Sequence, residues 1–217
     1  MQATLATLVA ALAMASSAAA YNIHFQNNCP YTESIPPPPP VLFAPRLPAL
    51  YLPFDLCGPR SPQVWAAVGK APNGQPDPSV AFGARLDPGQ PADFGVDNYQ
   101  LGIRAWGRTG CDDSGSNCAT GANQGGLTPT DGGITSGVIL SEYGYGDFGQ
   151  YGGQRTAWDL SRVNANVNIP TTLSATDGQS VYCGDNNCPD NQAYSYPTDY
   201  AADRNSALGT SFTHQFC

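Results

Sequence analysis

Charged side chains are scarce in this sequence: Asp, Glu, Lys and Arg together make up 12% of the 217 residues. Basic residues are the rarer kind, with 9 Lys and Arg against 17 Asp and Glu, and the formal net charge is −8. Nucleic acids and anionic membrane surfaces are bound by clustered basic side chains. The charge balance therefore argues against both as partners, and it fits a neutral polymer, a cation or no ligand at all.

The sequence also lacks any sustained helical periodicity. Its 24 Gly and 20 Pro are spread along the whole chain and interrupt every segment that could form a long helix. Short apolar or alternating segments separated by turn residues are typical of β-structure. The fold class predicted is all-β, a sandwich with long loops. The strands expected cover residues 21–26, 64–68, 79–86, 100–106, 137–141, 156–168 and 211–216.

Charge is absent from the first twenty residues. They contain an apolar run at 5–14 and end in three alanines, a pattern typical of a secretory signal peptide and too short for a membrane span. No second apolar stretch of spanning length follows. We expect residues 1–20 to be removed, and the mature protein, 21–217, to be extracellular with no membrane span.

Residues 33–63 do not fit the strand pattern. Five consecutive prolines at 36–40 are followed by apolar clusters, and proline cannot donate to a β-ladder. A polyproline segment leading into a surface loop is one interpretation. The preferred hypothesis is translated intron sequence, because 29–32 and 64–67 would read as one continuous motif without it. Sequencing the transcript tests this hypothesis, which a message containing the insert would overturn.

Cysteine usage indicates disulfides rather than a metal site, since the chain is expected to be exported and no histidine lies at zinc-ligand spacing from the cysteines. Cys57 falls in the insert and makes the count odd. The remaining six cysteines allow several sets of three bridges. Closure of short loops favours two local bridges, which leaves one long-range bridge between the ends of the chain. The bridges favoured are Cys111–Cys118, Cys183–Cys188 and Cys29–Cys217. No metal or other cofactor is expected.

Several motifs, in order along the chain, resemble those of the thaumatin-like family. The most distinctive is RAWGRTGC at 104–111. The others are NNCPYT (27–32) continued by VWAA (64–67), RLDPGQ (85–90), CATG (118–121), LSEY (140–143), WDLS (158–161), NIP (168–170), CPD (188–190), YSYP (194–197) and the terminal FC. The resemblance covers nearly all of the mature chain, and it implies a thaumatin-like β-sandwich.

The chain also departs from the family pattern. It has fewer cysteines than the family's usual complement, and only a dozen residues separate Pro170 from Cys183, where the family has a disulfide-rich second domain. The resemblance therefore implies a compact variant with a much reduced second domain, closest in style to small fungal or microbial members.

The family places one arginine, one glutamate and three aspartates around a surface cleft. Motif by motif, these positions fall on Arg104, Glu142, Asp159, Asn164 and Asp199. A one-residue insertion makes Asn166 an alternative to Asn164. Tyr143 and Tyr145 follow the glutamate in a Gly-rich segment, and we expect them to form a platform for carbohydrate.

Two neighbouring carboxyl groups can cut a glycosidic bond, one as the acid and the other as base or nucleophile. Glu142 and Asp159 are the candidates for these roles, with Arg104 orienting one carboxylate. The resemblance implies a monomer that binds β-1,3-glucan of cell walls, with weak endo-hydrolysis or antifungal activity. The alternative is a secreted structural or interaction protein whose acidic cluster only braces loops.

Overall fold

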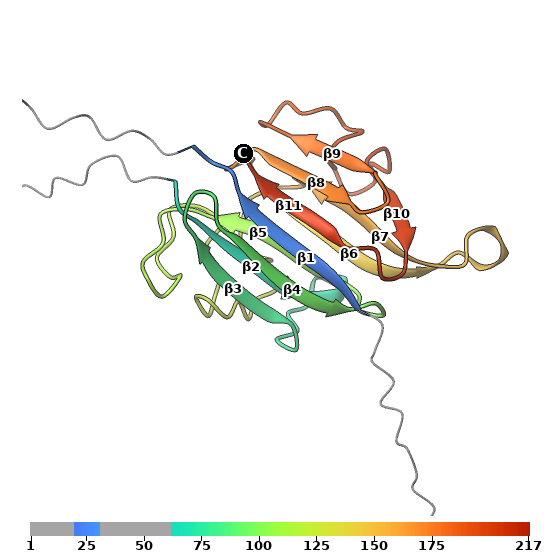
Figure 1. The fold of residues 1–217 in the computed structure, drawn as a ribbon, viewed down its shortest axis with the longest axis horizontal. Helices are drawn as coiled ribbons and strands as arrows, with labels where there is room; N and C mark the ends of the chain where they lie inside the picture. Colours follow the sequence, from blue (N-terminus) through green and yellow to red (C-terminus); the bar gives the residue numbers. More distant parts are fainter. Residues whose placement is uncertain (1–19, 31–61) are drawn as a thin grey trace, which may run out of the picture.

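The structure, a computed structural model, describes residues 20–30 and 62–217, which form two β-sheets stacked face to face (Figure 1). The first sheet has the strand order β4 (Pro91–Asp97), β1 (Ala20–Asn27), β11 (Phe212–Phe216), β8 (Thr171–Ala175) and β9 (Ser180–Cys183). The second has the order β10 (Arg204–Ala207), β7 (Gln154–Ser161), β6 (Leu140–Asp147), β5 (Ile103–Arg108), β2 (Val64–Lys70) and β3 (Ala81–Leu86). Two short 3-10 turns, η1 (Pro72–Gly74) and η2 (Gly149–Tyr151), complete the elements described. The predicted thaumatin-like sandwich is confirmed.

The core lies between the two sheets and follows the period-two alternation of the strands. In β1, Tyr21, Ile23 and Phe25 are buried while the residues between them are partly exposed. From the second sheet, Tyr143 and Trp158 pack against Phe212 of β11, with ring centroids 5.1 and 5.6 Å apart. Burial of apolar surface contributes about 25 cal/mol per Å², so these rings hold the two sheets together.

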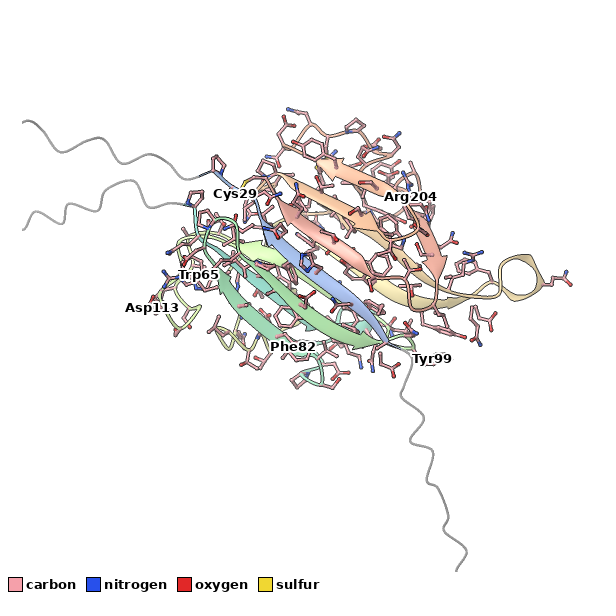
Figure 2. All side chains as sticks on the ribbon, in the orientation of Figure 1. Cys29, Trp65, Phe82, Tyr99, Asp113 and Arg204 are labelled. Carbon is pink, nitrogen blue, oxygen red and sulfur yellow. A yellow bond between two sulfur atoms is a disulfide. The ribbon has the colours of Figure 1, made fainter. Side chains whose placement is uncertain are left out.

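The two ends of the described chain meet. Strands β1 and β11 pair in parallel, with Ile23 opposite Phe212 and Asn27 opposite Phe216. Directly beyond this pairing, Cys29 bonds to Cys217 across 188 residues of sequence. Figure 2 shows Cys29 at the same end of the sandwich as Trp65, with Tyr99 at the opposite end. The two local bridges also form, Cys111–Cys118 and Cys183–Cys188, so the predicted pairing is confirmed.

A long loop, residues 109–139, covers part of the outer face of the second sheet. Trp106 is fully buried beneath it and donates its indole N–H to Gly121 O at 3.0 Å. Arg108 is also fully buried, and its guanidinium donates to carbonyl oxygens of β2 and of the loop, including Gly115 O and Gly126 O. These contacts fix the loop over the β2–β5 end of the face.

Two sequence predictions concern residues that are mostly outside the described part. The signal peptide, 1–20, lies outside it except for Ala20, and so do residues 31–61 of the Pro-rich region; both remain predictions. At the far side of that gap, Pro62 O accepts a hydrogen bond from Asn27 Nδ2 at 3.1 Å. The chain therefore re-enters the described fold next to the strand from which it left. Within the described residues, no helix has the length and apolar character needed to cross a membrane.

Candidate functional site

Three charged side chains form a row across the outer face of the second sheet. Arg104 of β5 lies opposite Glu142 of β6, and Glu142 lies opposite Asp159 of β7. Directly opposite residues in an antiparallel sheet point to the same face. The strand register therefore brings together three positions that are 38 and 17 residues apart in sequence.

This row forms part of the lining of a cavity of about 550 Å³. The sheet supplies one side of the cavity, and segments 133–138 and 163–165 supply further parts of its lining. The full lining consists of Gly74, Arg104, Gly133, Ile134, Ser136, Gly137, Val138, Leu140, Glu142, Asp159, Ser161, Val163, Asn164, Ala165, Tyr194 and Pro197. We call this cavity the acidic pocket.

Asp159 is the most perturbed acid at this site. Its Oδ1 has no exposed surface and no hydrogen-bond partner among the residues described. Burial raises the pKa of the Asp159 carboxyl well above its ordinary value, and the charges of Glu142 and Asp203 raise it further. Asp159 is therefore suited to hold a proton where an ordinary aspartate is ionised.

Glu142 has a different environment. Arg104 Nε donates to Glu142 Oε1 at 3.1 Å, and about a third of the Glu142 side chain is exposed. This ion pair holds the Glu142 carboxylate in a fixed orientation. The pocket thus holds two carboxyl groups in contrasting settings: Glu142 is paired with a cation, and Asp159 is desolvated and leaves its Oδ1 without a hydrogen bond among the residues described. This is an arrangement that separates acid and base roles.

Of the two candidates for the remaining cleft position, Asn164 and Asn166, Asn164 is the one that lines the acidic pocket. Asn164 lines the acidic pocket and adopts a left-handed backbone, φ 53°, which asparagine tolerates better than most residues. Asn166 instead pairs with Val138 and lines a smaller adjoining cavity of about 290 Å³. The two cavities share residues 136–138 in their linings.

Asp199 is not part of the acidic pocket, contrary to the expectation from the motif. Its side chain is only 4% exposed and accepts hydrogen bonds from Ser195 and from the backbone N–H of Ala201. Asp199 therefore holds the 195–201 loop in shape. It can affect the pocket only through that loop, which contributes Pro197 to the lining.

The expected aromatic platform is wrong for Tyr143, and Tyr145 does not line the acidic pocket. The Gly-rich segment after Glu142 continues β6 as far as Asp147, so period-two alternation points both tyrosines to the opposite face from Glu142. Tyr143 is 3% exposed and belongs to the core. Tyr145 packs on Tyr99, with ring centroids 5.2 Å apart.

Two residues near the site, Tyr194 and Asp203, were not predicted from the sequence to lie there. Tyr194 lines the acidic pocket and donates its hydroxyl hydrogen to Asp203 Oδ1. Asp203 precedes β10, a short polar edge strand, and its charge is one of those that raise the Asp159 pKa. Only the pairing of β10 with β7 brings Asp203 near Asp159. No cluster of three or more His, Cys, Asp or Glu residues in the described ranges is arranged to hold a metal ion.

Fold and site together define a disulfide-bonded β-sandwich of the thaumatin-like class, with an acidic pocket on the outer face of one sheet. Residues 60–217 match the model of the Thaumatin family, and this chain belongs to that family. It is a protein of the pathogenesis-related, thaumatin-like type.

The relatives are plant proteins. A "Thaumatin-like protein" of Oryza sativa subsp. japonica is 33% identical over 141 residues, which cover 64% of this chain and 74% of the relative. "Thaumatin-like pathogenesis-related protein 2" of Avena sativa is 33% identical over 124 residues, 56% of this chain and 67% of that protein. The solved structure of the thaumatin-like xylanase inhibitor TLXI superposes with a TM-score of 0.51 at 19% identity, covering 90% of this chain and 98% of the inhibitor. The last likeness supports the fold alone.

Proposed function

We propose that this protein is a secreted monomer that binds a neutral cell-wall polysaccharide, β-1,3-glucan, in the acidic pocket. The observation that carries the proposal is the Arg104–Glu142–Asp159 row at the side of an open cavity. Carboxylate and amide oxygens accept hydrogen bonds from sugar hydroxyls. The net charge of −8 also disfavours anionic polymers as ligands.

Weak hydrolysis of the bound chain is the second candidate function, and the contrast between the two carboxyl groups favours it. Asp159, whose pKa is raised by burial, donates its proton to the glycosidic oxygen as the C–O bond breaks. Glu142, as a carboxylate, stabilises or attacks the cationic anomeric carbon, or it takes a proton from the attacking water. One water is consumed: its oxygen adds to the anomeric carbon, displacing Glu142 where Glu142 has bonded to that carbon, and its proton restores Asp159 or passes to Glu142 and then to solvent. The products are a new reducing end and the released sugar chain.

The test is sedimentation of the purified mature protein with insoluble β-1,3-glucan, chitin and cellulose, with reducing ends counted in the supernatant. The variants are Glu142→Gln and Asp159→Asn, which keep side-chain shape and remove the carboxyl group. Asp113→Asn is the matched control, because Asp113 is 95% exposed, pairs with Arg85 and lies outside the pocket.

Binding in the pocket is supported if the wild type sediments with β-1,3-glucan and not with the other two polymers. The affinity for β-1,3-glucan should then be about tenfold lower in Glu142→Gln and unchanged in Asp113→Asn. Sugar release that disappears in Asp159→Asn while sedimentation persists supports hydrolysis. If the wild type sediments with none of the three polymers, the proposal is overturned and a structural or interaction protein is favoured.

A further inference from the structure

Beyond the acidic pocket, the outer face of the second sheet continues along β6 and β7 with almost no side-chain bulk. The β6 residues on the same face as Glu142 are Gly144 and Gly146. Opposite Gly144 on β7 lies Ala157. Small residues at successive outward positions of two paired strands leave room above the sheet for side chains from neighbouring segments. We call Gly144, Gly146 and Ala157 the glycine floor.

Two exposed apolar side chains lie over this floor. A Cβ built on Gly146 would be 2.8 Å from Phe148 Cε2, so the phenyl ring occupies the space that a side chain at 146 would fill. A Cβ on Gly144 would be 3.7 Å from Leu101 Cδ2. Phe148 is 46% exposed and Leu101 52% exposed. Both side chains therefore present apolar surface to solvent on the face that carries Glu142.

The floor and the pocket form one continuous surface. Glu142, Gly144 and Gly146 are successive outward positions of one strand, and a strand rises about 3.4 Å per residue, so the surface runs about 14 Å beyond the carboxylate. Arg155 lies opposite Gly146 at the far end, with its Nε bonded to Gly152 O at 3.0 Å. In Figure 1 the β6–β7 hairpin projects from one end of the sandwich.

We propose that the glycine floor, with Leu101 and Phe148, binds further units of the same neutral linear glycan whose first units occupy the acidic pocket. Sugar rings have apolar C–H faces that pack on aromatic and aliphatic side chains, and the small residues of the floor let Leu101 and Phe148 lie close against the sheet, where they supply that apolar surface. The floor itself carries no charge, which suits a neutral ligand. This inference rests on the function proposed above and adds that the site recognises chain length.

The experiment measures the affinity of the folded mature protein for a β-1,3-linked glucose disaccharide and hexasaccharide by calorimetry. Phe148→Ala removes the exposed ring. Gly144→Val raises the floor with a β-branched residue suited to a strand, and only Leu101 Cδ2 lies within 4 Å of the new Cβ. Phe82→Ala is the matched control, since Phe82 is 40% exposed but lies on the edge strand β3.

The wild type is expected to bind the hexasaccharide more tightly than the disaccharide. Phe148→Ala and Gly144→Val should weaken hexasaccharide binding by about fivefold to tenfold, as expected when an apolar contact of this size is lost. Disaccharide binding should change by less than about twofold, and Phe82→Ala should affect neither ligand.

The two proposals fail in distinguishable ways. If the wild type binds neither oligosaccharide nor polymer, the proposed function is wrong and this inference falls with it. If the wild type binds the hexasaccharide and both variants bind it equally well, the pocket acts alone and the inference is wrong. Equal weakening of both ligands would also overturn it, because that pattern means damage to the pocket rather than loss of an extension.

Discussion

Replacing His214 with phenylalanine should remove much of the protein's sensitivity to mild acid. His214 lies in β11, is fully buried between the sheets, and its pKa is lowered to about 3 by burial. Its Nδ1 is 2.7 Å from Ser141 Oγ, and its Nε2 has no partner in the described part of the chain. The ring packs on Phe25 and Phe216, with centroids 5.2 and 4.7 Å away.

The size of the effect follows from proton linkage. The unfolded chain binds a proton at this histidine below about pH 6.5, whereas the folded protein binds it only near pH 3. Stability from this group is therefore present above pH 6.5 and is lost as the pH falls toward 3. At pH 5 the loss is about 2 kcal/mol, from roughly 1.5 pH units at 1.36 kcal/mol each.

The assay is urea unfolding of wild type and His214→Phe at pH 8 and pH 5. A phenyl ring fits among the surrounding rings, and Ser141 Oγ still accepts from Tyr143 O–H at 3.1 Å and reaches Ala105 O at 3.3 Å. The variant carries a constant stability offset at both pH values. The wild type should lose about 2 kcal/mol more than the variant between them, a difference in midpoint of about 1 M urea.

The other histidine, His24, is partly exposed, pairs with Asp93 and is present in both proteins, so its contribution cancels. Equal losses of stability in the two proteins between pH 8 and pH 5 would show that His214 is not held neutral by the fold.

Three further predictions concern stability. Arg108→Met should destabilise the fold by about 3–5 kcal/mol, because it leaves buried carbonyl oxygens of β2 and the covering loop without their donor; a urea midpoint within error of the wild type would contradict this. Asp159→Asn should be more stable than the wild type at pH 8 but not at pH 4. Because the pKa of Asp159 is raised in the folded protein, the wild type loses stability as the pH rises above the ordinary range of an aspartate, whereas the variant does not. Urea unfolding of both proteins across this pH range is the measurement, and parallel stability profiles would count against the prediction. Deleting residues 33–61 should preserve the three disulfides and the thermal midpoint to within a few degrees, because the hydrogen bond between Asn27 and Pro62 shows that the segments on either side of the deletion are neighbours; loss of cooperative melting would show that the deleted segment is needed for folding.

The parts of the fold predictable from sequence were those with a local signal. The alternating apolar residues of 21–26 and 211–216 predict strands that the structure contains as β1 and β11. Loop closure was enough to predict the cysteine pairing. The strands follow a period of two and two of the bridges close short loops, whereas Cys29–Cys217, 188 residues apart, followed only by elimination.

Four of the described strands, β4, β8, β9 and β10, were not expected from the sequence, and two of these, β4 and β10, form through tertiary pairing rather than local preference. β4 starts at Pro91 and contains Gly95, and β10 has the sequence RNSA; both are edge strands, where proline and polar residues are tolerated. β6 was expected to end at 141, because Gly144 and Gly146 were interpreted as part of a loop.

Because β6 extends to Asp147, Glu142 lies within a strand and its neighbours are set by strand pairing. The Arg104–Glu142–Asp159 row, whose members had been assigned by motif, is produced by strand register, and the structure brings all three together. The position of Asp203 depends on β10, so no pattern around it in the sequence could have placed it near Asp159.

The central claim is that the acidic pocket binds β-1,3-glucan, and the most direct test is sedimentation of wild type, Glu142→Gln and Asp113→Asn with insoluble β-1,3-glucan. We expect the wild type and Asp113→Asn to sediment with the polymer, and the affinity of Glu142→Gln for the polymer to be about tenfold lower, so that most of this variant stays in solution. Sedimentation of all three proteins to the same extent would place glucan binding outside the pocket, and sedimentation of none would contradict glucan binding altogether.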